Sequence, residues 1–175
     1  MTAPTSSDAF ARYRLARACF ETDPRAAVDH AQAALELFAR DAAELPGLIA
    51  LLAHALERAG MLAAVVELAK ACESRWPTFV ELHYRKARAL RKLGRHVEMF
   101  EAFDACLAMG NTKDPPGLPG AGSWLPLIAL GEIAEEQGDA DAARVMFARA
   151  GVEGEERLRA MSNGAGGAGD ALHPR

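Results

Sequence analysis

The same landmarks occur twice in this chain, 34 residues apart, in AHALERAGMLAAVVELAKAC at residues 53–72 and in ARALRKLGRHVEMFEAFDAC at residues 87–106. The recurring pairs are Ala53 with Ala87, Leu56 with Leu90, Gly60 with Gly94 and Cys72 with Cys106. Recurrence at a fixed period of about 20–50 residues is the sequence signature of stacked repeats. We number positions so that both glycines stand at position 15, which places Pro77 at position 32 of its unit.

A third copy, GEIAEEQGDADAARVMFARA at residues 131–150, has Gly138 at position 15. Gly138 lies 44 residues beyond Gly94, which is ten more than the period. We assign the excess to an insertion at residues 111–122, whose three prolines and three glycines exclude a helix. Long loops in compact repeats are often functional, so function and a tolerated surface insertion both remain open here.

A more divergent copy comes first, in DPRAAVDHAQAAL at residues 23–35. Its small residues Ala27, Ala31 and Ala34 take positions 20, 24 and 27. A pattern of small residues at positions 8, 20 and 27 with glycine at position 15 is typical of the tetratricopeptide repeat (TPR). Residues 8–155, approximately, resemble this family. The resemblance implies an all-α solenoid of about four antiparallel helix pairs in a right-handed superhelix.

Composition agrees with helices and excludes several functional classes. Alanine, the best helix former, occurs 38 times, against 15 β-branched residues, which argues against an all-β fold. Half of the 175 residues are hydrophobic, so a core can form, and the net charge of −4 gives no global reason to expect a nucleic-acid partner. We predict a cytoplasmic protein without a membrane partner. The three cysteines are an odd count, which is a poor basis for disulfides, no apolar run is long enough to span a membrane, and the N-terminus does not resemble a signal peptide.

The period also predicts the domain organisation. We expect a disordered N-terminus at 1–7, a helical repeat domain at 8–161 and a flexible Gly/Ala-rich tail at 162–175. The repeat units are expected at about 8–41, 46–79, 80–111 and 123–156. The expected helix pairs are 8–21 with 24–40, 46–59 with 62–75, 79–93 with 96–109, and 123–137 with 140–151.

Motifs for catalysis, cofactors or metals are not found in the sequence. No GxGxxG, P-loop, GxSxG, HExxH or CxxC pattern occurs, and the five histidines show no clustered ligand spacing. Cys72 and Cys106 recur at a small-residue position, so we interpret both as core residues. Asp139 and Asp141 open a repeat helix, where acidic residues cap the N-terminus and complement its dipole. We therefore predict no enzyme activity, no cofactor and no metal.

The TPR resemblance implies that the first helix of each pair lines a concave groove. Its exposed residues would include an acidic strip with an apolar start in the fourth unit and a basic centre in the third. The predicted partner-binding residues are Tyr13, Arg17, His54, Tyr84, Arg85, Arg88, Arg91 and Lys92. Such a groove suits an acidic peptide, because arginine binds carboxylates in a planar fork. A solvated charged helix face, with Glu57 and Glu81 offsetting part of the charge, is the alternative interpretation.

Some TPR proteins bind C-terminal carboxylates through asparagines at position 9 of one unit and position 6 of the next. These positions hold His54 and Arg88, and Leu51 and Arg85, so that clamp is not expected. A second resemblance covers residues 83–106, the Pro/Gly-rich insertion and residues 122–131. This stretch is similar to repeat arrays attached to bacterial family-2 glycosyltransferases. The favoured hypothesis is an interaction scaffold or adaptor. The alternatives are a chaperone or pilot of a secretion or pilus system and an accessory subunit of a bacterial glycosyltransferase or other modifying enzyme. Exposed solenoid ends also allow a homodimer.

Overall fold

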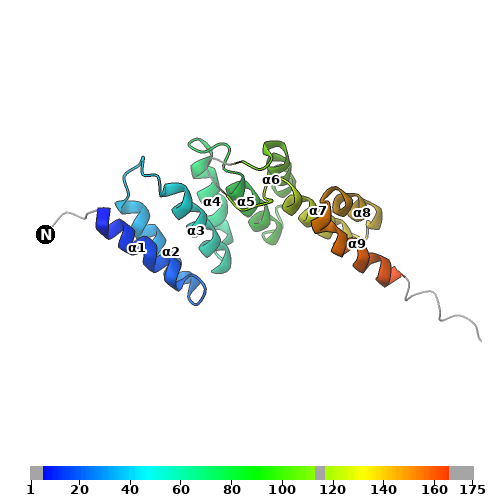
Figure 1. Cartoon of the computed structure of the whole chain (residues 1–175), viewed down its shortest axis with the longest axis horizontal. Coiled ribbons are helices and arrows are strands. Elements are labelled where there is room, and N and C mark those ends of the chain that lie inside the picture. Colours follow the sequence, from blue (N-terminus) through cyan, green and yellow to red (C-terminus); the bar gives the residue numbers. More distant parts are fainter. Residues whose placement is uncertain (1–5, 113–116, 166–175) are drawn as a thin grey trace, which may run out of the picture.

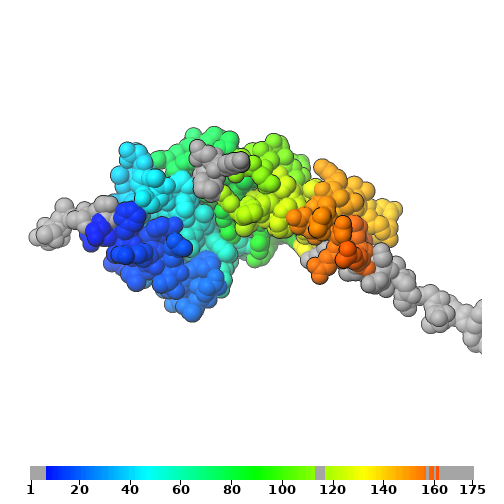
Figure 2. All heavy atoms as spheres, in the orientation of Figure 1, coloured from blue at the N-terminus to red at the C-terminus, as the bar shows by residue number. Residues whose placement is uncertain are grey.

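A computed structural model describes residues 6–112 and 117–165, and within these ranges the chain forms helices and no strands. The helices are α1 (Ser6–Cys19), α2 (Pro24–Leu37), α3 (Leu45–Arg58), α4 (Leu62–Glu73), α5 (Val80–Lys92), α6 (His96–Met109), α7 (Trp124–Glu136), α8 (Ala140–Arg149) and α9 (Val152–Ala165). Consecutive helices pair and the pairs stack into an elongated row, with α1 and α2 at one end and α8 and α9 at the other (Figures 1 and 2). This architecture confirms the all-α, TPR-like solenoid.

A glycine in the left-handed conformation ends the first helix of each of the last three pairs. Gly60, Gly94 and Gly138 have φ angles of 75°, 71° and 80°. In each case the next residue donates its N–H back across the turn, as Met61 does to the Leu56 carbonyl at 2.9 Å. A Cβ added at these glycines would meet nothing within 4 Å, so backbone conformation and not space selects glycine here.

Close helix packing explains the small residues at position 8. Ala53 and Ala87 are fully buried. A Cβ added to Gly131 would lie 2.5 Å from Cε1 of Phe147, a distance that real Cβ contacts do not show. Buried apolar residues from all four pairs form one continuous cluster, from Ala16 in α1 to Ile133 in α7.

The first two residues of the insertion are hydrogen-bonded to the array on either side of it. Thr112 Oγ1 donates to the Thr78 carbonyl at 3.0 Å, and Asn111 Nδ2 donates to Ser123 Oγ at 3.0 Å. Ala121 is fully buried, and no helix forms in the described parts, 111–112 and 117–122. The insertion is therefore built into the joint between α6 and α7, with residues 113–116 outside the described chain.

The helical part is longer at both ends than the expected 8–161. Helix α1 begins at Ser6, and α9 continues to Ala165, past the expected start of the tail at residue 162. Leu158 and Met161 of α9 are partly buried and pack against a cluster around Phe147, which attaches this helix to α8. Residues 1–5 and 166–175, where disorder is expected, lie outside the described residues.

Overpacking should therefore be costly at position 8. We expect Ala87→Leu and Gly131→Leu each to lower the free energy of unfolding by about 1–3 kcal/mol. Ala108→Leu, on the exposed face of α6, should cost much less. Urea denaturation followed by circular dichroism measures all three, and equal losses would show that the repeat register is wrong.

The cysteines should differ in reactivity, because the thiolate is the nucleophile. Burial raises the pKa of the Cys106 thiol to about 12 and also raises the pKa of Cys72. Cys19 in α1 is only partly buried. We expect a chromogenic thiol reagent to label native Cys19 faster than the other two, and rapid labelling of Cys106 would contradict its placement in the core.

Candidate functional site

An open cleft of about 720 Å³ lies between α5 and α7, and we call it the α5–α7 cleft. It is lined by Tyr84, Arg88, Arg91 and Lys92 of α5, His96 of α6, and Leu125, Ile128, Ala129, Glu132 and Glu136 of α7. The α5 wall carries the cations. The α7 wall is apolar over its first turns and acidic further along, so the cleft offers both apolar and charged contacts.

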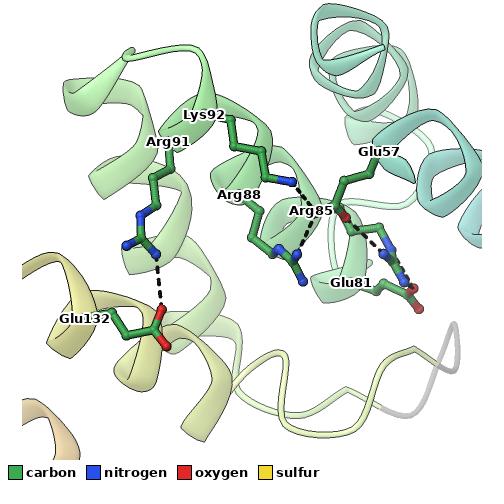
Figure 3. A network of polar contacts seen from close by, with 7 residues as sticks. All are labelled: Glu57, Glu81, Arg85, Arg88, Arg91, Lys92 and Glu132. Atoms are coloured by element: carbon green, nitrogen blue, oxygen red, sulfur yellow. Dashed lines mark hydrogen bonds and ion pairs between the residues drawn. The ribbon is translucent and has the colours of Figure 1, made fainter. Parts of the chain in front are cut away.

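A buried ion network lies behind the α5 wall (Figure 3). Arg85 donates through Nε and Nη2 to Glu81 Oε1, at 2.8 and 2.7 Å, and through Nη1 to Glu57 Oε2 at 3.3 Å. All three side chains are less than 10% exposed. Because Glu57 belongs to α3 and the other two to α5, the network joins the second and third helix pairs.

Two further cations approach the same carboxylate from the cleft side (Figure 3). Arg88 Nη2 lies 2.8 Å and Lys92 Nζ 3.7 Å from Glu57 Oε1. That oxygen is buried and accepts no well-directed hydrogen bond from the described residues, so the Arg88 contact is an ion pair. The Arg88 and Lys92 side chains remain 43% and 51% exposed. Both can therefore meet a ligand while facing a carboxylate of their own.

Arg91 connects the two walls of the cleft. Its Nη1 lies 3.3 Å from Glu132 Oε2, and its Nη2 lies 2.6 Å from Glu136 Oε1. These ion pairs link α5 to α7, which the insertion separates along the chain. The acidic strip of α7 is thus partly neutralised by the basic centre of α5.

Four of the predicted partner-binding residues line the cleft: Tyr84, Arg88, Arg91 and Lys92. The expectation that Arg85 is exposed is wrong, because its side chain is 6% exposed and is paired with two carboxylates. Tyr84 is also 6% exposed, although it contributes to the cleft floor. Its ring packs against the Phe103 ring, with centroids 6.2 Å apart.

The other three predicted residues lie on the first two helix pairs and do not line the cleft. His54 packs edge-on against Phe20 with ring centroids 4.6 Å apart, Tyr13 packs against the core, and Arg17 is exposed. Sequence reasoning missed His96, because it is the first residue of a second helix and only first helices were expected to face the groove. Its place directly after the turn that follows Lys92 is the signal that could have identified it.

No group of three or more His, Cys, Asp or Glu side chains capable of holding a metal ion occurs among the residues that the structure describes. Among the described helices, none is both long and apolar enough to span a bilayer.

Comparisons with known proteins support the fold. No protein-family model and no curated protein matches the sequence. Among solved structures, the crystal structure of MamA, a TPR-like protein, aligns with a TM-score of 0.64 over 87% of this chain and 81% of that chain. The sequence identity is 16%, so the similarity establishes the TPR-like fold and nothing finer.

Two histidines should make the fold sensitive to mild acid. Burial lowers the pKa of His54 below 6.5, with nearby Arg85 adding to the effect, and burial likewise lowers the pKa of His83. As pH falls through 6.5, the unfolded chain takes up protons that the folded chain does not, so unfolding becomes more favourable.

We expect Tm to fall between pH 7.5 and pH 5.5, and the fall to be smaller in a His54→Gln, His83→Gln double variant. Differential scanning calorimetry at matched ionic strength measures the slope. Identical slopes in the wild type and the double variant would contradict the assignment.

Proposed function

We propose that this protein is a non-catalytic interaction scaffold that binds a segment of a partner protein in the α5–α7 cleft. The observation that carries the proposal is the cleft itself, which combines an apolar wall at Leu125 and Ile128 with half-exposed cations at Arg88 and Lys92. Binding sites of this kind are concave and largely apolar, with a few charged groups that fix orientation.

The charges of the cleft specify the segment further. Three cations, Arg88, Arg91 and Lys92, and two carboxylates, Glu132 and Glu136, line it. Arg91 is paired across the cleft with both carboxylates. Arg88 and Lys92 share the Glu57 carboxylate, which Arg85 also contacts. A partner segment with an acidic side chain facing Arg88 and Lys92, and apolar side chains facing α7, fits this arrangement.

The more extended acidic peptide that the sequence predicts would also reach the first two helix pairs. Tyr13, Arg17 and His54 would contact only a segment that continues along the array toward α1. The cysteines are free, which agrees with a reducing compartment, and we propose that binding takes place in the cytoplasm.

The choice of variants follows from the ion network. Arg88→Glu would bring a second carboxylate against buried Glu57 and would test folding and binding together. Lys92→Glu changes the α5 wall at a half-exposed side chain. Ile128→Asp changes the α7 wall at a residue that also packs against the cluster around Phe147, so circular dichroism is used to verify that both variants remain folded. Glu135→Lys, on an exposed part of α7 outside the cleft, is the matched control.

Peptides that are selected from a displayed random library for binding to the full-length protein should bind in the cleft. We expect Lys92→Glu and Ile128→Asp each to reduce the affinity for a selected peptide by about tenfold, or ~1.4 kcal/mol. Glu135→Lys should leave this affinity unchanged. Binding should also weaken as salt rises, since exposed charges are screened within about 8 Å at physiological ionic strength. Fluorescence anisotropy measures Kd, and wild-type affinity in both cleft variants would place the binding site elsewhere.

A further inference from the structure

The first two joints of the array bury one face of the second helix of each pair. Position 21 is Val28 in α2 and Val66 in α4, which are 3% and 0% exposed. Helix α3 packs along α2, and α5 packs along α4. At each of these joints, the first helix of the next pair packs against the helix that carries the buried position-21 residue.

The third joint leaves the equivalent face open. Position 21 of α6 is Phe100, which is 40% exposed. Leu93 at position 14 is 39% exposed, whereas its equivalent in the preceding unit, Ala59, packs against the core. Helix α7 approaches α6 at only a few points, and the insertion separates the two helices in sequence. The added residues therefore hold α7 away from the place that α3 and α5 occupy at the earlier joints.

The fourth pair offers a comparison for an exposed position 21. In α8, against which α9 packs, this position is Arg144, an exposed charged residue whose ion pair with Asp141 lies on the surface. Position 21 is thus charged where it is exposed in α8, whereas in α6 it is the large apolar residue Phe100, and this difference makes the α6 face a candidate contact surface.

The open face continues into the α5–α7 cleft. His96 lies one turn before Phe100 on α6 and lines the cleft, and Leu93 directly follows the cleft residue Lys92. We call Leu93, His96 and Phe100, together with Leu125 and Ile128 of α7, the joint surface. His96, Leu125 and Ile128 line the cleft, whose other lining residues include the cations of α5 and the carboxylates of α7, and Leu93 and Phe100 are exposed apolar residues next to it along the chain.

We propose that an amphipathic helix of a partner protein occupies the joint surface, taking the place that α3 and α5 take at the first two joints. The inference rests on the proposed function, because the helix would enter the same cleft. A helix is the favoured form, because the corresponding faces of α2 and α4 are each covered by a helix. Its apolar face would contact Phe100 and Ile128, and a carboxylate beside that face would meet Arg88 and Lys92.

Two displayed peptide libraries distinguish a helix from an extended segment. Members of the first carry leucine at i, i+3, i+4 and i+7 with glutamate and random residues between them. The second has the same pattern with two interior prolines, which prevent a helix. We expect binders to the full-length chain from the first library alone, with affinity for Phe100→Asp reduced by about tenfold or more.

A second variant and a control keep the result interpretable. Leu93→Lys changes the same surface from the α5 side, and circular dichroism verifies that both variants remain helical. Val145→Asp, at an exposed apolar residue of α8 outside the joint, should leave Kd within about twofold of the wild type. Loss of binding in Phe100→Asp and Leu93→Lys with retention in Val145→Asp supports the inference.

The remaining outcomes separate this inference from the proposed function. Binders that are lost in Ile128→Asp but unaffected by both Phe100→Asp and Leu93→Lys would overturn the helix at the joint and leave cleft binding standing. Binders from the proline library would likewise overturn the helical form alone. No binders from either library would count against both. A wild-type dimer in sedimentation that Phe100→Asp dissociates would show that a second copy, and not a partner helix, covers the surface.

Discussion

Close crossing of paired helices is the constraint on which this structure depends. Gly131 lies so near the Phe147 ring that even a methyl group would overlap it, and Ala53 and Ala87 occupy the same position with no exposed surface. Backbones that approach this closely need small side chains on the inner faces. The abundance of alanine and the scarcity of aromatic residues are therefore consistent with the close packing of the helices.

The buried ion network gives the centre of the array a different character. Removing two carboxylates and a guanidinium from water is costly, and the pairs repay that cost only because their geometry satisfies most of the polar atoms. Glu57, Glu81 and Arg85 meet this condition and hold α3 to α5. The same carboxylate of Glu57 faces Arg88 and Lys92, so the network also sets how much positive charge the cleft presents to a ligand.

The sequence was sufficient for the helix pairs because the period repeats local signals. Gly60, Gly94 and Gly138 mark the turns by a conformation that glycine favours, and the confirmed fold follows from their spacing. Burial of Arg85 was not predicted. The register indicates that Glu57 and Glu81 offset part of the basic charge, but it does not show that their carboxylates enclose the Arg85 guanidinium. Glu57 contributes its carboxylate from 28 residues away. The displacement of α7 depends on how the insertion packs, which its prolines and glycines do not specify.

The weak contact between α6 and α7 has a consequence for folding. In a linear array, stability is approximately the sum of each unit's own stability and its interfaces with its neighbours, so cooperativity is lowest where an interface is smallest. Helices α7 to α9 are joined to the rest mainly through the described ends of the insertion, the Arg91 ion pairs and the apolar contacts of Ala129 and Ile133. The final pair can thus open as a unit while the first three pairs stay folded, and amide protons in α7 and α8 would exchange with solvent ahead of those in α3 to α5.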